Sequence, residues 1–192
     1  MKVVITGGGG FLGQVLAREI ITLKQLRSGS SPLETTVTEL ILADVVEPKE
    51  YLFDLHSLAK SNGIKLHVKT GDVSNIDYCK ELIGTPSNNT DSSDCDGDAL
   101  SVFHLGAVMS GAPPDLALKV NLYGTINMLE ATRAWQEAST SNVRPTFIFS
   151  SAGATLGSGH SADWVQNGDT ISDATRAAPV SNDMCGPTKM SN

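Results

Sequence analysis

Short apolar runs rich in β-branched residues alternate along the chain with longer segments whose apolar residues recur every three or four positions. The short runs predict strands that are buried on both faces, because they offer no polar side. The longer segments predict helices that bury one side. The expected strands are residues 1–6, 39–45, 64–68, 100–105 and 146–150. The expected helices are residues 11–26, 76–83 and 115–138.

This alternation predicts an α/β protein built from right-handed strand–helix–strand units around a parallel sheet. The expected architecture is a Rossmann-type, doubly wound parallel sheet in a single domain over residues 1–192, truncated on its C-terminal side. In the helix expected over 115–138, the apolar side is predicted from the helical spacing of four residues: Leu116, Val120, Ile126 and Leu129.

Two polar segments interrupt the alternation. Residues 85–98 are rich in Ser, Asn and Asp, with little to bury, and are predicted to form a flexible surface insertion. Residues 158–181 show no periodicity and are interpreted as a long loop that covers a site or has no ordered structure. Neither segment predicts a further strand or helix.

Charge and composition narrow the classes of partner. The 192 residues carry 21 acidic against 14 basic side chains, a net charge of −7. This balance argues against binding to nucleic acid or to an anionic membrane surface. No run of about 18 apolar residues predicts a membrane span, and no secretory signal precedes the first strand, so a cytoplasmic protein is expected. The three cysteines have no metal-ligand spacing, and no metal site is expected.

The glycine-rich segment TGGGGFLG at residues 6–13 joins the first strand to the first helix. Glycines at this spacing let the backbone approach a pyrophosphate, which then faces the N–H groups at the helix start. A tight turn without a ligand is the alternative, whereas a Walker A loop is excluded because no Gly-Lys-Ser/Thr follows. The residues predicted to bind a dinucleotide here are Gly7, Gly10, Phe11, Leu12 and Gly13.

Acidic residues end the next two strands. Asp44 is positioned to accept hydrogen bonds from the adenosine ribose and to repel a 2′-phosphate, which favours NAD over NADP; the alternative is an Asp that caps a turn. Asp72, with Val73 beside it, is interpreted either as a contact to the adenine edge or as the N-cap of the following helix. His104, at the end of the fourth strand, is interpreted as structural.

Taken together, these segments resemble the extended short-chain dehydrogenase/reductase superfamily, in its NAD-dependent epimerase/dehydratase group. Within that group, HLGAVMSG at residues 104–111 and DLALKVNLYGT at residues 115–125 are similar to the D-erythronate dehydrogenase branch. The long link before ELILAD at residues 39–44 is similar to that branch too. The resemblance covers nearly the whole chain.

The resemblance implies NAD as cofactor and a small molecule as substrate. It implies that Leu105, Gly106 and Ala107 line the cofactor, that Ser110 faces the substrate, and that Asn121 braces the active-site helix. It also implies a homodimer formed through the long helices. Members of the superfamily continue into a substrate-binding region beyond the last residues of this chain, and that part is expected to be missing.

The catalytic segments of the superfamily are a Ser or Thr after the fifth strand and a Tyr-x-x-x-Lys pair. In SSAGATLG, at residues 150–157, Ser151 offers the hydroxyl if the loop holds one extra residue, since Ala152 otherwise stands there. In CGPTK, at residues 185–189, Lys189 matches the lysine and Cys185 stands at the tyrosine position. A cysteine sulfur ends where the tyrosine ring begins, so it falls short of the substrate.

The expected function is therefore an NAD-dependent oxidoreductase acting on a small hydroxy acid or sugar derivative. Three alternatives stay open at this point. The same cofactor site also serves a nucleotide-sugar epimerase or dehydratase. Cys185 is compatible with an NAD-binding module whose catalysis is impaired. An incomplete domain that pairs with another chain through an exposed sheet edge is the third.

Overall fold

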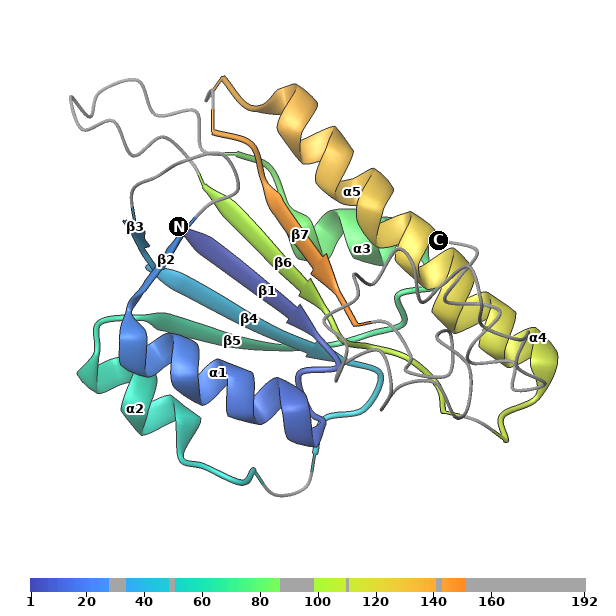
Figure 1. The fold of residues 1–192 in the computed structure, drawn as a ribbon, viewed down its shortest axis with the longest axis horizontal. Helices are drawn as coiled ribbons and strands as arrows, with labels where there is room; N and C mark the ends of the chain where they lie inside the picture. Colours follow the sequence, from blue (N-terminus) through green and yellow to red (C-terminus); the bar gives the residue numbers. More distant parts are fainter. Residues whose placement is uncertain (28–33, 49–50, 87–98, 110, 141–142, 151–192) are drawn as a thin grey trace, which may run out of the picture. The chain divides into compact units, whose positions relative to one another are not determined.

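The computed structural model describes residues 1–27, 34–48, 51–86, 99–109, 111–140 and 143–150. Its centre is a five-stranded sheet in the order β5-β4-β1-β6-β7, in which every neighbouring pair is parallel (Figure 1). The strands are β1 (Lys2–Thr6), β4 (Glu39–Asp44), β5 (Lys65–Thr70), β6 (Leu100–His104) and β7 (Thr146–Phe149). The expected strands and the parallel, Rossmann-type α/β sheet are confirmed.

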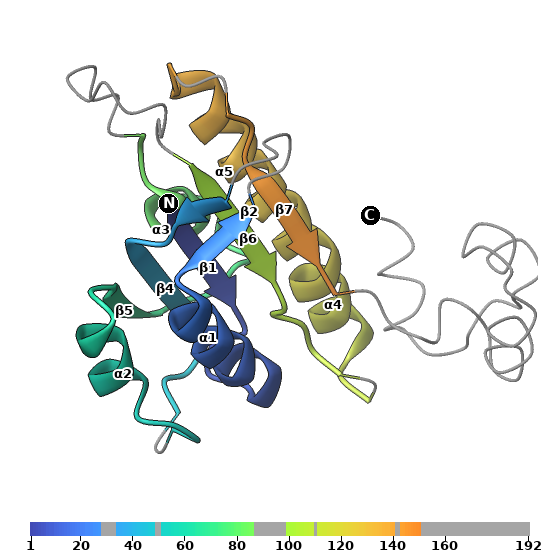
Figure 2. The same cartoon turned by 60° about the vertical axis from the view of Figure 1, so that its left-hand side comes forward.

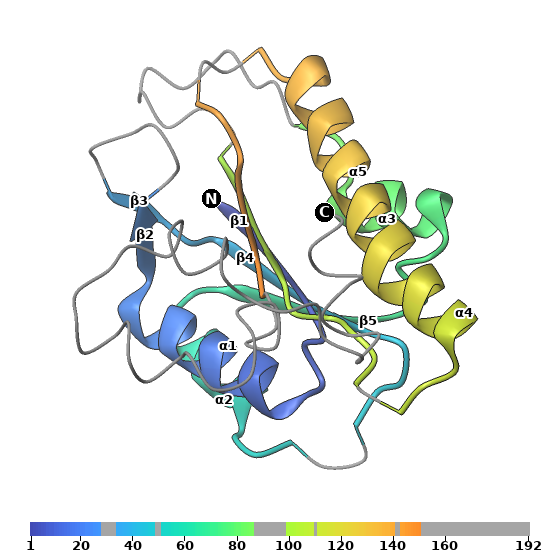
Figure 3. The same ribbon diagram turned by 45° about the vertical axis from the view of Figure 1, so that its right-hand side comes forward.

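Helices cover both faces of this sheet. Helices α1 (Phe11–Leu23) and α2 (Leu55–Ser61) lie over one face, and α3 (Ile76–Ile83) lies over the other with the C-terminal part of α5 (Gly124–Ala138) (Figure 3). Side chains of β1 alternate between the two resulting cores, with Val3 and Ile5 on the α1 side and Val4 on the α3 side. The winding is therefore double, as predicted.

Strand order changes direction between β1 and β6. From β1 the chain builds outward through β4 to β5, and then returns to place β6 and β7 on the other side of β1. In open parallel sheets of this kind, ligands bind beyond the carboxyl ends of the strands at such a reversal. The carboxyl ends of β1 and β6 are Thr6 and His104, so the glycine-rich segment begins at that point.

Of the described residues, those within 107–126 belong to one compact unit, and those within 1–106 and 127–149 belong to another. In the first of these lie α4 (Pro114–Ala117), the π-helix η1 (Leu118–Tyr123) and the first residues of α5. The helix expected over 115–138 is thus three consecutive helical segments. A π-helical turn holds more residues than an α-helical turn, so it changes which residues share a side before and after it.

The predicted apolar side of this long helix was wrong. Leu116, Ile126 and Leu129 are each 41% exposed. The buried positions of the three segments are a different set that includes polar residues: Ala117, Asn121, Thr125, Met128, Ala131, Thr132 and Trp135. The spacing of the large aliphatic residues was misleading because small and polar side chains occupy the buried side, and because η1 shifts the helical phase.

A hairpin of two short antiparallel strands, β2 (Gln25–Arg27) and β3 (Glu34–Thr36), was not predicted (Figure 2). The first helix was expected to continue to residue 26, but it ends at Leu23, because Lys24 adopts a left-handed conformation with φ of 60°. Helix α2 was not predicted either. Its N-cap is Asp54, whose carboxylate accepts a hydrogen bond from the Ser57 N–H at 3.0 Å. Most of the predicted insertion at 85–98 and all of the segment 158–181 lie outside the described residues.

Candidate functional site

The glycine-rich turn has no room for side chains at its first and last positions. Gly7 has φ of +69°, and a Cβ atom there would lie 2.9 Å from the Gly106 nitrogen. A Cβ atom at Gly13 would lie 2.3 Å from the Gly7 carbonyl oxygen, so the start of α1 packs directly on the turn. Gly8 is equally confined, because its Cβ would lie 2.9 Å from Leu42 in β4. The backbone conformation and the packing both require glycine here.

The N-terminal end of α1 is open. Gly10 is its N-cap and no side chain caps the first turn, so N–H groups of that turn point beyond the helix end. Phe11 and Leu12 follow with 69% and 63% of their surface exposed. A Cβ at Gly10 would meet only the Gly7 carbonyl oxygen, at 3.3 Å. An open helix N-terminus beside a glycine backbone suits an anion such as a pyrophosphate.

The Asp44 carboxylate lies at the edge of this turn. Its Oδ2 atom accepts a hydrogen bond from the Gly9 N–H at 3.0 Å, and its Oδ1 atom accepts one from the Val45 N–H at 2.8 Å. The side chain therefore does cap a turn, but each oxygen keeps capacity for a further donor. Burial raises the pKa of the Tyr51 phenol, and the negative charges of Glu47 and Asp44 raise it further. The surroundings of Asp44 are thus acidic.

One residue of this region was missed by the sequence analysis. Gln14, on α1, is 4% exposed and bonds at both ends of its amide. Its Nε2 donates to the Gly9 carbonyl oxygen at 2.8 Å, and its Oε1 accepts from the Leu52 N–H at 2.6 Å. The sequence feature that could have identified Gln14 is a glutamine among the apolar positions of an amphipathic helix.

Asp72 does not cap the helix that follows it. The N-cap of α3 is Asn75, whose side chain accepts a hydrogen bond from the Asp77 N–H at 2.9 Å. Asp72 instead closes a local turn by accepting from the Ser74 N–H at 2.9 Å, so the N-cap interpretation was wrong. Helix α3 starts at Ile76, three residues later than an N-cap at Asp72 would need.

The Val73 carbonyl oxygen is a junction between two helices. It accepts a hydrogen bond from the Asn127 side chain at 3.0 Å and one from the Cys79 thiol at 3.1 Å. Asn127 belongs to α5 and Cys79 to α3. These bonds hold the backbone just after β5, where Asp72 and Val73 are predicted to contact the cofactor. Asn127 had no sequence signal, since an asparagine within a helix is common on exposed sides.

The end of β6 is attached to the end of β1. The Leu105 N–H donates to the Thr6 carbonyl oxygen at 3.1 Å, and the Gly106 N–H donates to the Thr6 hydroxyl at 3.2 Å. Since Gly106 also lies against Gly7, the segment expected to line the cofactor borders the glycine turn. His104 is fully buried, in keeping with a structural residue.

Asn121 makes a two-point contact within the other compact unit. Its Oδ1 accepts from the Val108 N–H at 2.9 Å, and its Nδ2 donates to the Val108 carbonyl oxygen at 3.1 Å. Asn121 is fully buried and lies in η1. The amide therefore fixes the extended backbone at Val108, next to Ala107, to the π-helix.

The remaining predicted site residues lie outside the described part of the chain: Ser110, Ser151, Cys185 and Lys189. Within the described ranges, no cluster of three His, Cys, Asp or Glu side chains could hold a metal ion. Nor is any described helix both long and apolar enough to cross a membrane.

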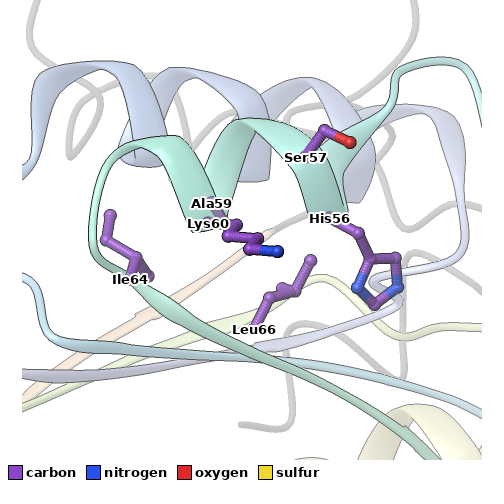
Figure 4. A pocket seen from close by; sticks show the side chains of 6 residues that line it. All are labelled: His56, Ser57, Ala59, Lys60, Ile64 and Leu66. Atoms are coloured by element: carbon purple, nitrogen blue, oxygen red, sulfur yellow. The ribbon is translucent and has the colours of Figure 1, made fainter.

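A separate pocket of about 360 Å³ lies between α2 and β5. Four residues of α2 line the pocket: His56, Ser57, Ala59 and Lys60. Leu66 lines it from β5, and Ile64 from the position just before that strand. Figure 4 shows Leu66 of β5 below the Lys60 side chain, with the His56 ring to one side. The residues singled out by sequence do not line this pocket, so it is distinct from the glycine turn.

A model of the 3-beta hydroxysteroid dehydrogenase/isomerase family matches residues 4–189. The chain belongs to this family. The match confirms the superfamily predicted from the motifs, because the family is one of extended short-chain dehydrogenases/reductases. It covers the glycine turn, Asp44 and the C-terminal segment with Cys185 and Lys189 alike.

Two curated relatives are D-erythronate dehydrogenases. The relative from Haemophilus influenzae is 31% identical over 184 residues, which are 94% of this chain and 45% of that protein. The relative from Cupriavidus necator is 32% identical over 160 residues, which are 82% of this chain and 40% of that protein. This member of the family therefore spans less than half the length of the curated relatives it matches.

Solved structures share the fold. The dTDP-glucose 4,6-dehydratase DesIV from Streptomyces venezuelae, solved with NAD bound, matches with a TM-score of 0.61 at 18% identity. The match covers 99% of this chain and 48% of the dehydratase. At this identity the likeness establishes the Rossmann-like arrangement of this family member.

Proposed function

We propose that this chain forms the NAD-binding part of an oxidoreductase that acts on a small hydroxy acid or sugar derivative. The observation that carries the proposal is the Asp44 carboxylate, held by the Gly9 and Val45 N–H groups beside the glycine turn. A carboxylate in that place is poised to accept hydrogen bonds from the two hydroxyls of an adenosine ribose.

The residues present fit NAD. The backbone-only turn between Gly7 and Gly13 and the uncapped start of α1 suit the pyrophosphate. Asp44 and Glu47 contribute negative charge at the ribose end, where NADP would bring a further phosphate. The discrimination therefore comes from like-charge repulsion, and the proposed cofactor is NAD.

The proposed chemistry is oxidation of a hydroxyl group, for which NAD supplies the hydride acceptor when bound. By the family resemblance, Ser151 would polarise the reacting oxygen and Lys189 would hold the nicotinamide ribose, with Ser110 facing the substrate. Cys185 occupies the place of the proton-transferring tyrosine. The substrate class is supported by the two relatives that are named D-erythronate dehydrogenases.

Two other functions compete with this one. A nucleotide-sugar epimerase or dehydratase would use the same cofactor cradle, as the name of the structurally similar dTDP-glucose 4,6-dehydratase illustrates. An NAD-binding module with impaired catalysis is favoured by Cys185. Net reduction of added NAD separates the first alternative from an oxidoreductase, because epimerases and dehydratases regenerate their cofactor within the cycle.

The deciding experiment is calorimetric titration of the purified chain with NAD and with NADP. We expect NAD to bind, and Asp44→Asn to weaken it by about 10- to 100-fold, since hydrogen bonds to charged groups contribute about 1.5–3 kcal/mol. The same variant should reduce the ratio of the affinity for NAD to the affinity for NADP. Asp77→Asn, at an exposed acid on α3, is the matched control and should bind as the original chain does. A cooperatively folded chain that does not bind NAD contradicts the proposal.

We also propose that the chain forms a homodimer through α5, as the resemblance implies. Leu129 supports this, because a large aliphatic side chain in the middle of that helix is 41% exposed. Around it lie the charged residues Glu130 and Arg133, which form an ion pair with N···O at 2.9 Å. An apolar position with a polar rim is typical of interfaces between subunits.

A further inference from the structure

The side-chain amide of Gln14 hydrogen-bonds to two different loops at the glycine turn, one through each end of the amide. The buried side chain donates through Nε2 to the Gly9 carbonyl oxygen at 2.8 Å and accepts through Oε1 from the Leu52 N–H at 2.6 Å. Gly9 and Leu52 belong to different loops, one before α1 and one before α2. The amide therefore ties together two segments that sequence places far apart.

Gly9 is held on both of its polar groups. Its N–H donates to the Asp44 Oδ2 atom at 3.0 Å, while its carbonyl oxygen accepts from Gln14. A Cβ atom at Gly9 would lie 3.0 Å from the Pro48 ring and 3.1 Å from the Asp44 carboxylate. The Gly9 peptide is thus one of the two groups that hold the Asp44 carboxylate, together with the Val45 N–H.

The connection between β4 and α2, described over residues 45–48 and 51–54, makes few other directional contacts with α1. Val45, Val46 and Leu52 are exposed by 65%, 68% and 55%. Tyr51 and Phe53, on either side of Leu52, are partly buried against the core that includes α1, but such apolar contacts do not orient the Leu52 N–H. The described polar contacts of this connection with α1 are the Gln14 bond and the Arg18 guanidinium, which lies 4.8 Å from the centre of the Phe53 ring. Since exposed cation–π contacts are weak, the amide is the main directional restraint.

We infer that Gln14 is a positioning residue for the cofactor: it sets the Gly9 peptide and the loop after Asp44 in the arrangement that binds the adenosine ribose. This inference rests on the proposed function. At neutral pH the amide meets both requirements, because its Nε2 atom donates to Gly9 and its Oε1 atom accepts from Leu52. A carboxylate can satisfy Leu52 alone, and an aliphatic side chain satisfies neither.

The test compares Gln14→Leu with the original chain in two measurements. Hydrogen exchange of the Leu52 amide, without cofactor, reports on the link itself. We expect exchange to become about tenfold faster, the effect of losing one hydrogen bond of about 1.4 kcal/mol. Calorimetric titration with NAD and with AMP reports on binding. Both affinities should fall by a similar factor of about tenfold, because the link acts on the adenosine end that the two ligands share.

A second variant, Gln14→Glu, adds a readout that a merely structural role would not move. When ionised, its carboxylate accepts from Leu52 but cannot donate to Gly9. When protonated, it can do both. Relative to the original chain at each pH, its NAD affinity should therefore rise as the pH falls from 8 to 5, whereas Gln14→Leu should show no recovery. Absence of recovery in Gln14→Glu overturns the inference.

Thr22→Val is the matched control, since it removes a side-chain hydrogen bond from the same helix, to the Arg18 carbonyl oxygen at 2.8 Å. It should leave both measurements unchanged. If Leu52 exchange becomes faster in Gln14→Leu but the NAD affinity is unchanged, the inference is overturned and the proposed function stands. The same holds if Leu52 exchange in Gln14→Leu is unchanged. An original chain that folds but does not bind NAD overturns the proposed function and this inference with it.

Discussion

The Thr6 hydroxyl and the Nδ1 atom of His104 lie 2.6 Å apart, at the carboxyl ends of β1 and β6. The same hydroxyl accepts a hydrogen bond from the Gly106 N–H at 3.2 Å. Thr6 and His104 are 1% and 0% exposed, so water cannot replace these bonds. One threonine oxygen therefore joins the two strands at the strand-order reversal and sets Gly106 against the glycine turn.

Replacing Thr6 by valine should destabilise the fold. The substitution keeps the shape and removes the hydroxyl that contacts the buried His104 ring and the half-buried Gly106 N–H. We expect a loss of about 1–3 kcal/mol in the free energy of unfolding, measured in urea. Thr6→Ser is the control, since it keeps the hydroxyl and loses one methyl group, at a cost of about 0.8 kcal/mol. A valine variant as stable as the serine variant contradicts the assigned role.

Gly13 and Gly10 should respond differently to alanine. The Cβ of Gly13→Ala would lie 2.3 Å from a backbone oxygen, which cannot move aside, and we expect a loss of about 1–3 kcal/mol in stability. At Gly10 the nearest atom is 3.3 Å away, so Gly10→Ala should fold normally. It should still weaken NAD binding by about tenfold or more, because a methyl group then stands where the pyrophosphate approaches. Thermal unfolding and calorimetry measure the two effects, and normal NAD binding by Gly10→Ala contradicts the placement of the pyrophosphate.

Cys79 should be unreactive while the chain is folded. Burial, together with the negative charge of Asp72, raises the pKa of its thiol from 9.0 to about 12. The raised pKa makes the fold more stable below pH 9, and this contribution is lost as pH climbs towards 12, because the unfolded chain releases the proton first. In a Cys95→Ser and Cys185→Ser background, a thiol reagent at pH 8.5 should react only as fast as the chain unfolds. Rapid reaction without unfolding contradicts the burial.

Restoring a tyrosine at position 185 should increase hydride transfer. A phenol reaches the substrate where a cysteine sulfur stops short, and positioned acid–base groups contribute about 100-fold or more in rate. The measurement is NADH absorbance with a panel of hydroxy acids, comparing Cys185→Tyr with the original chain. Cys185→Phe is the control, because it has the ring without the hydroxyl. Equal rates for the tyrosine and phenylalanine variants contradict the proposed role of position 185.

A charge in the middle of α5 should prevent dimer formation. Leu129→Glu would place an unpaired carboxylate within the proposed interface, where its desolvation is unfavourable. We expect a dimer for the original chain and a monomer for the variant in sedimentation velocity. Gln136→Glu, an exposed position on the same helix, adds the same charge and should remain dimeric. A monomeric original chain contradicts the homodimer.

The spacing of apolar residues along the chain was sufficient to predict much of the fold. Helix α3 begins and ends at the residues expected, Ile76 and Ile83, because its apolar spacing is regular and an Asn N-cap and a glycine bound it. The sheet strands were predicted because each contains a short apolar run. The expected burial on both faces holds for β1, β4 and β6, whereas β5 and β7 are partly exposed because they lie at the edges of the sheet. The β2–β3 hairpin and α2 were missed, since such short elements depend on neighbours for their stability.

The sequence by itself determined the family, the parallel α/β sheet and the glycine turn with an acid after the second sheet strand, since these depend on spacing along the chain. Only the tertiary structure decided which side of α5 is buried, that Asp72 closes a turn, and that Gln14 joins Gly9 to Leu52. The reason is physical. A hydrogen bond between residues 38 apart, like burial beneath a sheet, exists only once the intervening chain has folded and brought its partners within reach.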